Sequence, residues 1–279
     1  MLSKQIITQL PLKSIHDVQS VPGGDINDAY SIYSGDRRYF LKLHKHTDNN
    51  FFTSEATGLE LLRKAARTPK VIHKGVIGAQ DYLILEWIAE GTRRNEAKLG
   101  RVLAHVHRQT DTRFGFAFNS YAGQLPQDNR REKDWATFYL ERKLGPLIGY
   151  AEARGYWNVT RQQAFERFGE RFSQTYKNRT VTPSLLHGDL WGGNIMYDRN
   201  GDPVLIDPSV FYGNREMDLA MTLLFGGFGS EFYQAYQEAY PLEEGWQARV
   251  PWYQLYYLLC HLIMFGEGYG AAVDRALRS

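Results

Sequence analysis

The chain has 279 residues and a formal net charge of +2, with 43% hydrophobic and 23% charged residues, which are ordinary values for a globular protein of one large or two small domains. The balanced charge and the lack of a Lys/Arg-rich block argue against a nucleic-acid partner, and the longest apolar run, 256–265, is too short to span a membrane. With one cysteine and no apolar leader at the N-terminus, we expect a soluble cytoplasmic protein, a monomer or weak dimer without disulfides.

The first ninety residues have the pattern of a small antiparallel sheet with one helix. The β-prone runs YSIY and RYFLKL flank the turn residues 34–36, which predicts a hairpin. The segments 71–77 and 81–88 predict two further strands around a second turn.

A helix is predicted between these two pairs of strands. Glu55 recurs at helical spacing with Leu59, Leu62 and Ala66, so its carboxylate points in the same direction as the apolar stripe. Because an unpaired carboxylate is too costly to bury, Glu55 requires a partner.

The pattern becomes mainly helical after Gly91. Helices are expected over 98–108, 134–148 and 160–176, and from 215 to the end with breaks near 226–229 and 241–245. These patterns predict an α+β protein with an N-terminal domain, 1–89, and a larger C-terminal domain, 90–279. Clefts between such halves are favoured ligand sites.

The stretch LLHGDLWGGNIM concentrates polar groups between two apolar segments. Asp189 and Asn194 lie within it, and Asp207 follows a short apolar strand. Two carboxylates and an amide oxygen suit Mg²⁺, and phosphoryl transfer needs such a set to orient a hydroxyl and hold the metal. The alternative is a structural Asx turn with an unrelated aspartate at a strand end.

HGDLWGGNI followed by LIDP resembles the aminoglycoside phosphotransferase-like branch of the protein-kinase fold. The longer segments LLHGDLWGGNIM, IDPSVFYGNREMDLAM and LLFGGF resemble the fructosamine/ketosamine-3-kinase family. GGDINDAY, FLKL, SEATGLELL, LGRVLAHVHR and FGFAFNSYAG are similar to its bacterial members, so the resemblance covers nearly the whole chain. The HGD core is shared by many small-molecule kinases, whereas DLWGGN and PSVFYG are more specific.

The resemblance implies a two-lobed protein-kinase-like fold that binds ATP and Mg²⁺. Asp189 would be the catalytic base, and Asn194 and Asp207 would hold the metal. Lys42 would contact the ATP phosphates with Glu55 as its partner, which supplies the partner that the helical spacing requires. The alternative for Lys42 is an exposed strand lysine.

Two further parts of the ATP site follow from the resemblance. Gly23 and Gly24 stand where a phosphate-covering loop is expected, although a hairpin turn also explains two glycines. Glu86, Trp87 and Ile88 fall at the hinge, where backbone groups would bind adenine.

The resemblance also places Trp191, Tyr212 and His261 near the sugar. Either aromatic ring could instead pack beneath the catalytic loop. Cys260 and Ile263 stand where the family pattern leads us to expect asparagines, which puts fine substrate preference in doubt.

The substrate implied is a ketosamine, such as a fructosamine or ribulosamine, free or protein-bound, phosphorylated at its 3-hydroxyl in deglycation repair. A kinase of an aminoglycoside, choline or a sugar is a second possibility. For a polycationic aminoglycoside an acidic cleft is expected, but Glu243-Glu244 is the longest acidic run in the C-terminal half. An inactive binding module is a third possibility. Loss of Lys42, Asp189 or Asp207 would indicate it, but all three are present.

Overall fold

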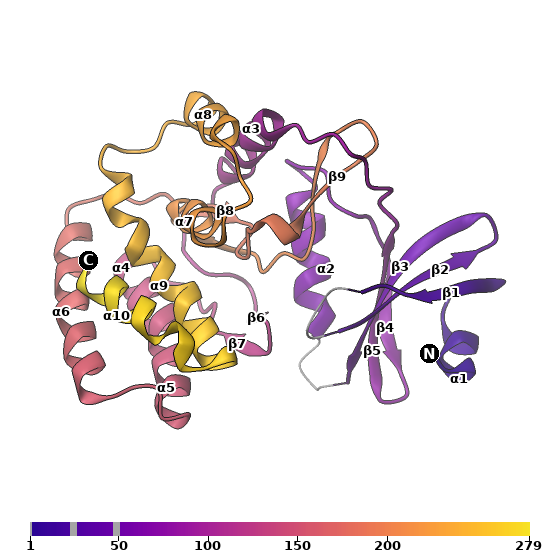
Figure 1. The fold of residues 1–279 in the computed structure, drawn as a ribbon, viewed down its shortest axis with the longest axis horizontal. Coiled ribbons are helices and arrows are strands. Elements are labelled where there is room, and N and C mark those ends of the chain that lie inside the picture. The colour runs from indigo at the N-terminus through magenta and orange to yellow at the C-terminus, as the bar shows by residue number, and fades with distance from the viewer. Residues whose placement is uncertain (1, 23–26, 47–50) are drawn as a thin grey trace. The chain divides into compact units, whose positions relative to one another are not determined.

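The computed structural model describes residues 2–22, 27–46 and 51–279 (Figure 1). The chain forms two compact units, the first comprising Met1–Asn95 with Asn194–Pro208 and the second Glu96–Gly193 with Ser209–Ser279. These units differ from the predicted division at residue 89, because a later hairpin joins the first unit. Backbone hydrogen bonds from Gly91 to Tyr197 (2.9 Å) and from Leu205 to Arg67 (2.9 Å) hold that hairpin.

The first unit contains a five-stranded antiparallel sheet. Its strands are β1 (Ile15–Ser20), β2 (Asp28–Ser34), β3 (Arg37–Lys45), β4 (Val71–Ile77) and β5 (Gln80–Glu86), in the order β1-β2-β3-β5-β4. The predicted hairpin is confirmed, with Ser34 opposite Arg37 and Gly35 at a φ of +56° in the turn. Such positive φ favours glycine, which explains why the turn residues could be recognised in the sequence.

Helices cover both faces of this sheet, and period-2 alternation along β5 assigns each side chain to a face. Leu83 and Leu85 pack with α2 (Phe51–Leu62), the predicted helix, whereas Tyr82 and Ile84 pack on the opposite face. The short helix α1 (Lys4–Gln9), which the sequence patterns did not predict, contributes to that opposite face (Figure 1). Ser3 caps α1 by accepting a hydrogen bond from the Ile6 amide.

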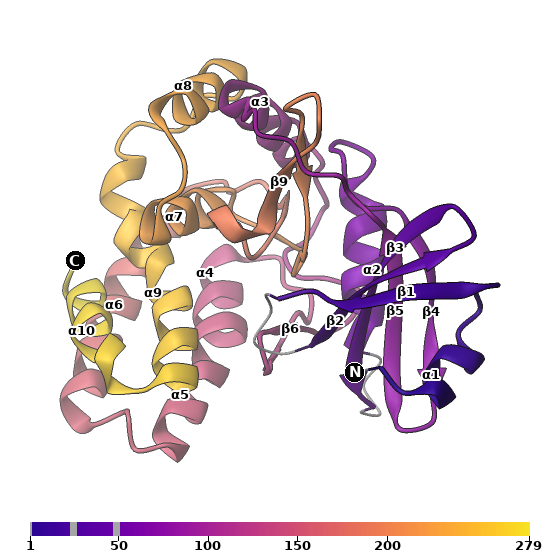
Figure 2. The same cartoon turned by 45° about the vertical axis from the view of Figure 1, so that its right-hand side comes forward.

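The second unit is mainly helical (Figure 2). α3 packs against α8, α9 packs against α5, α7 and α10, and α10 also packs against α6. Its helices are α3 (Glu96–His107), α4 (Trp135–Thr137), a π-helix (Phe138–Leu144), α5 (Gly145–Ala153), α6 (Val159–Tyr176), α7 (Glu216–Phe225), α8 (Ser230–Ala239), α9 (Trp246–Phe265), a 3₁₀ turn (Glu267–Tyr269) and α10 (Gly270–Arg278). The predicted breaks after α7 and α8 are present, whereas the single helix expected over 134–148 is divided by the π-helix.

Short antiparallel strand pairs frame the polar stretch. β8 (Ser184–Leu186) pairs with β11 (Phe211–Gly213), and β9 (Ile195–Tyr197) pairs with β10 (Pro203–Leu205). A third pair, β6 (Ser120–Ala122) and β7 (Leu125–Gln127), lies in the second unit, and a 3₁₀ turn, Gly192–Asn194, precedes β9. The loop from His187 to Trp191 therefore begins at the end of a buried strand. In the described part of the chain, no helix combines the length and apolarity that a membrane crossing requires.

Candidate active site

In the first unit, Lys42 forms the centre of a buried ionic cluster. Its Nζ donates to Glu55 Oε1 at 2.8 Å and to Asp207 Oδ1 at 2.6 Å. β3 directs Lys42 to the face covered by α2, since its neighbours Leu41 and Leu43 pack on the opposite face. The structure therefore provides the partner that the inward-facing Glu55 required.

The charges in this cluster support one another. Burial alone lowers the pKa of Lys42, but the adjacent Glu55 and Asp207 carboxylates outweigh it and raise the pKa above its usual value. Burial raises the pKa of Glu55, and the Lys42 ammonium opposes that shift. We conclude that Lys42 is a permanent cation held by two carboxylates, because its ion pairs with both are short.

Asp207 and Asn194 lie at the same end of the β9–β10 hairpin. Ile195 pairs with Leu205, and the next amide, of Ile206, donates to the Asn194 carbonyl at 3.1 Å. Asp207 has a φ of +53°, and its side chain is 43% exposed. One of its oxygens accepts from Lys42, and the exposure leaves the carboxylate accessible to a hard cation. An accessible carboxylate, with an asparagine at the same end of the hairpin, is of the ligand type that Mg²⁺ prefers.

In the second unit, Asp189 lies on a loop held by the carboxylate of Asp218. The amides of His187 and Gly188 donate to Asp218 Oδ2 (2.7 Å) and Oδ1 (2.9 Å). The amide of Asp189 donates to His187 Nδ1 at 3.3 Å. The His187 side chain therefore hydrogen-bonds the loop backbone, and Asp218 fixes the loop through two amides.

Asp218 is itself supported by a chain of buried donors. His107 Nε2 donates to Asp218 Oδ2 at 3.1 Å, and Tyr236 Oη donates to His107 Nδ1 at 2.8 Å. Burial lowers the pKa of His107 despite the Asp218 charge, so the ring is neutral with its proton on Nε2. The sequence pattern marked His107 only as a helix residue, since its polar partners come from distant segments.

Gly193 allows a close approach by the Trp191 ring, whereas Gly192 is in ordinary van der Waals contact with Gly227. A Cβ added to Gly193 would lie 2.2 Å from the Trp191 ring, and one added to Gly192 would lie 3.5 Å from the Gly227 Cα. The ring therefore folds back over Gly193 while 43% of Trp191 stays exposed. This exposure leaves part of the ring available to a ligand.

The other two predicted substrate residues have partners within the second unit. Tyr212 lies in β11, where its ring is 6.3 Å from that of Phe116 and burial raises its pKa. His261 Nδ1 donates to the Tyr257 carbonyl at 2.8 Å, and its ring centroid lies 4.6 Å from that of Phe225. Burial lowers the pKa of His261, so the ring is neutral near pH 7.

Of the predicted hinge residues, Glu86 ends β5 and Trp87 and Ile88 follow it, and their contacts are mainly structural. Glu86 accepts from Arg67 at 2.6 Å, and the Arg38 guanidinium lies 3.6 Å from the Trp87 ring centroid. Ile88 is buried. Gly23 and Gly24 lie outside the described residues.

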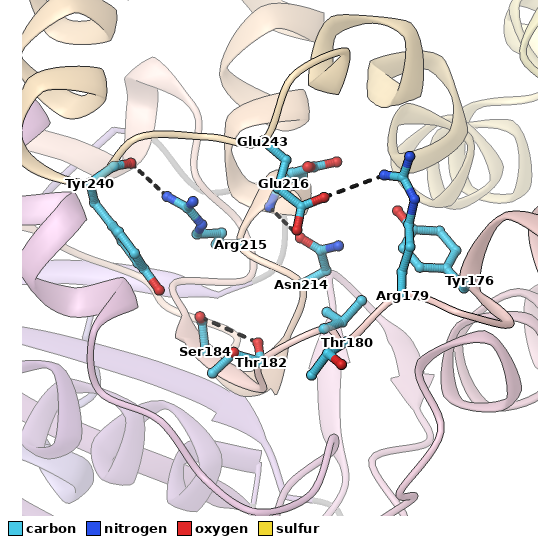
Figure 3. Close-up of a pocket in the computed structure, with 11 residues that line it drawn as sticks. Tyr176, Arg179, Thr180, Thr182, Ser184, Asn214, Arg215, Glu216, Tyr240 and Glu243 are labelled. Atoms are coloured by element: carbon cyan, nitrogen blue, oxygen red, sulfur yellow. Dashed lines mark hydrogen bonds and ion pairs between the residues drawn. The ribbon is translucent and has the colours of Figure 1, made fainter.

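A polar cavity of about 110 Å³ also lies in the second unit (Figure 3). Arg179 and Glu243, which pair at 3.3 Å, line it together with Asn214 and Glu216, and Arg215 there donates to the Tyr240 carbonyl at 2.7 Å. None of the residues predicted for the catalytic site lines this cavity. Glu216 accepts from Arg249 at 2.8 Å.

Comparison with known proteins gives a consistent result. The family model described as fructosamine kinase matches residues 1–279. A "Probable ketoamine kinase" of Lactiplantibacillus plantarum is 51% identical over 276 residues, covering 99% of this chain and 98% of its own. The chloroplastic protein-ribulosamine 3-kinase of Arabidopsis thaliana is 36% identical over 270 residues, covering 95% of this chain and 82% of its own.

Solved structures show the same relationship at the level of the fold. A Thermobifida fusca protein described as a candidate fructosamine-3-kinase has a TM-score of 0.85 at 29% identity, covering 95% of this chain and 93% of its own. The aminoglycoside phosphotransferase APH(4)-Ia has a TM-score of 0.65 at 16% identity, covering 95% and 94%. At that identity the second likeness shows only that the fold is kinase-like.

Proposed function

The chain belongs to the fructosamine kinase family, and we propose that it transfers the γ-phosphoryl group of ATP to the 3-hydroxyl of a ketosamine, free or protein-bound. The observation that carries this proposal is the buried Lys42–Glu55–Asp207 cluster in a chain whose whole length matches that family. Such a cluster presents a fixed ammonium and an accessible carboxylate, which phosphate and its metal require.

The first unit supplies the groups for the nucleotide. Lys42 donates to phosphate oxygens, and its orientation is maintained by Glu55. Asp207 and Asn194 hold Mg²⁺, which when bound neutralises charge on the phosphates. Backbone groups at 86–88 bind adenine.

The second unit supplies the groups for the acceptor. Asp189 accepts the proton of the sugar hydroxyl, and Asp218 keeps its loop in position through the amides of His187 and Gly188. The exposed part of the Trp191 ring packs on the apolar C–H face of the sugar, and Tyr212 and His261 border the same substrate. Phosphorylation makes the adduct unstable, so that the amine is released and the modified protein is repaired.

The state of the single cysteine bears on the compartment in which the enzyme acts. Cys260, the single cysteine, is buried, and burial raises its pKa to about 12, which favours the reduced thiol. We infer a cytoplasmic enzyme that acts as a monomer or weak dimer.

An ADP-release assay tests the proposed function. We expect turnover with fructosamine or ribulosamine in the presence of ATP and Mg²⁺, and a fall in kcat of at least about 100-fold in Asp189→Asn, because the amide cannot accept the hydroxyl proton. Asp202→Asn, which changes a carboxylate outside the proposed site, is the control.

The same assay with an aminoglycoside, choline and simple sugars separates the substrate from the reaction type. Turnover of one of these alcohols without turnover of any ketosamine would overturn the proposed substrate class. It would leave the proposed kinase reaction intact. Full activity of Asp189→Asn on a ketosamine would overturn the proposed base.

A further inference from the structure

Lys143 is a lysine with its side chain buried inside the second unit. It lies in the π-helix Phe138–Leu144, and only 1% of the residue is exposed. Its Nζ donates to Asn129 Oδ1 at 2.6 Å. An interior ammonium is costly unless other groups compensate its charge, and π-helical turns often occur at functional sites.

Aromatic rings surround the ammonium on several sides. The Lys143 Nζ lies 3.9 Å from the ring centroid of Phe211, 5.5 Å from that of Phe138 and 5.9 Å from that of Tyr256. The negative faces of aromatic rings attract cations, and the attraction is strongest where water is excluded. The rings come from three different elements, so the ammonium connects β11, α9 and its own helix.

Hydrogen bonds extend from Lys143 to the loop that carries Asp189. Asn129 Nδ2 donates to Ser120 Oγ at 3.0 Å, and Ser120 Oγ lies 3.3 Å from Ser209 Oγ. The Ser209 amide then donates to the His187 carbonyl at 2.9 Å. The Ser209 carbonyl also lies directly against Gly188, since a Cβ added there would be 1.9 Å from its oxygen.

The charged groups around Lys143 come from two other segments. The carboxylate of Asp128, beside Asn129, favours the ammonium electrostatically, and the Cys260 thiol on α9 would do so only where it is ionised. Burial is the main reason that the pKa values of Cys260 and Tyr256, both on α9, are raised. The charge of Asp189 raises both of them further. Lys143 therefore supplies a positive charge to the interior region that also experiences the charge of Asp189.

Burial has a large effect on this ammonium. It lowers the pKa of Lys143 to about 7, although Cys260 and Asp128 oppose the shift. A lysine whose pKa falls on folding makes the folded state less stable when it is charged, so replacing it by an apolar side chain of similar length should not destabilise the protein. The buried charge of Lys143 therefore does not stabilise the folded state.

We propose that Lys143 is a positioning residue for phosphoryl transfer: held by Asn129 and three aromatic rings, its ammonium supports from within the unit the loop that presents Asp189. The proposal rests on the proposed function, because it takes Asp189 as the catalytic base. It assigns a role to a residue that does not touch the substrate.

Lys143→Met removes the charge and keeps the length of the side chain, and Lys143→Arg keeps a charge that does not titrate. For Lys143→Met we expect kcat to fall by about 10- to 100-fold, with KM for ATP within about twofold, because displacement of a reacting group lowers kcat. Its Tm should equal or exceed that of the wild type. If Lys143 had only a structural role, Lys143→Met would instead lower Tm and leave the kcat of the folded enzyme unchanged. That result would overturn the proposal.

The pH profile tests the ammonium itself. The wild-type kcat should decline as the pH rises through about 7, where Lys143 loses its proton, and Lys143→Arg should lack that decline. Identical profiles for the two proteins would overturn the role of the charge. If Lys143→Arg does not fold, Asn129→Ala, which removes the acceptor at 2.6 Å, should lower kcat in the same way as Lys143→Met, and unchanged kcat overturns the proposal.

Hydrogen exchange separates this inference from the proposed function, because it needs no substrate. At one fixed pH near 6.5, the amides of 184–194 should exchange about tenfold faster in Lys143→Met than in the wild type. Faster exchange in a protein that phosphorylates no ketosamine would retain the positioning role and overturn the function. Unchanged exchange in a protein that phosphorylates a ketosamine would support the proposed function and overturn the positioning role of Lys143.

Discussion

Single charged side chains in the first unit depend on contacts between distant segments. Lys42 joins Glu55 on α2 to Asp207, which follows β10. Asp207 also adopts a positive φ of +53°, a conformation that aspartate tolerates better than most residues and that often occurs at functional sites. The position of its carboxylate therefore depends on both the backbone and the ion pair.

Lys42→Met should have separate effects on activity and on stability. Activity should fall by about 100-fold or more, because a preorganised donor to the transferred phosphoryl group is lost. At pH 8 the free energy of unfolding should fall by about 3 kcal/mol, because Glu55, with 12% of its side chain exposed, stays buried without its main cation.

The loss of stability in Lys42→Met should depend on pH. Burial raises the pKa of Glu55 above its usual value of 4.5, so folding favours the protonated carboxyl. The resulting stability is fully present below pH 4.5 and is lost as the pH rises through the pKa of Glu55 in the folded state. Tm should therefore recover on acidification from pH 8 toward pH 5.5, and the double variant Lys42→Met/Glu55→Gln should not show that recovery. Equal pH dependence of the single and double variants would contradict the assignment.

At the scale of elements, the loop that carries Asp189 is bounded on several sides by backbone. β8 leads into it, the first turn of α7 supplies Asp218, and the segment before β11 supplies Ser209. Gly188 is the point of closest approach, since its φ is +83° and an added Cβ would be 1.9 Å from the Ser209 carbonyl. The loop geometry therefore requires glycine at position 188.

Gly188→Ala should destabilise the protein by about 3 kcal/mol, because it combines a positive φ with a collision against backbone. For a chain of this size Tm should fall by about 6–12 °C, as measured by calorimetry. Gly149→Ala is the matched control: Gly149 is exposed in α5 with no atom within 4 Å of an added Cβ, so the change should stay within about 1 kcal/mol. A Gly188→Ala protein as stable as the control would contradict this account.

Element prediction succeeded where one face of a segment is apolar and failed where the segment is short. The period-3.6 pattern located α3 and α6, and the apolar, β-prone runs on either side of a turn located β4 and β5. The three-residue strands β8 and β11 have no detectable period, since their pairing depends on contacts with each other. The π-helix inside the expected helix at 134–148 also left no signal, because its residues have an ordinary helical composition.

At the scale of the whole molecule, the family match extends from residue 1 to residue 279 and therefore includes both units. The first unit contains the proposed nucleotide ligands and the second contains the proposed base. Binding of a nucleotide should therefore be measurable by its effect on the unfolding of the complete chain.

A non-hydrolysable ATP analogue with Mg²⁺, at about 100 times its Kd, should add about 2.7 kcal/mol to the free energy of unfolding and raise Tm by about 5–11 °C. EDTA should remove most of this increase, because Asp207 and Asn194 would no longer be joined to the phosphates by the cation. Asp207→Asn should reduce it even with Mg²⁺. An increase of equal size with Mg²⁺ and with EDTA would contradict the assignment of the metal ligands.

The sequence by itself determined the family, the helix and strand periods, and the local motif from His187 to Asn194, because each depends on residues close together in the chain. Only the tertiary structure decided which groups meet. The Lys42–Asp207 pair, the hold of Asp218 on two loop amides, and the aromatic surroundings of Lys143 each join distant segments. The physical reason is that a charge is tolerated inside a protein only beside its compensating groups, and folding rather than spacing along the chain brings those groups together.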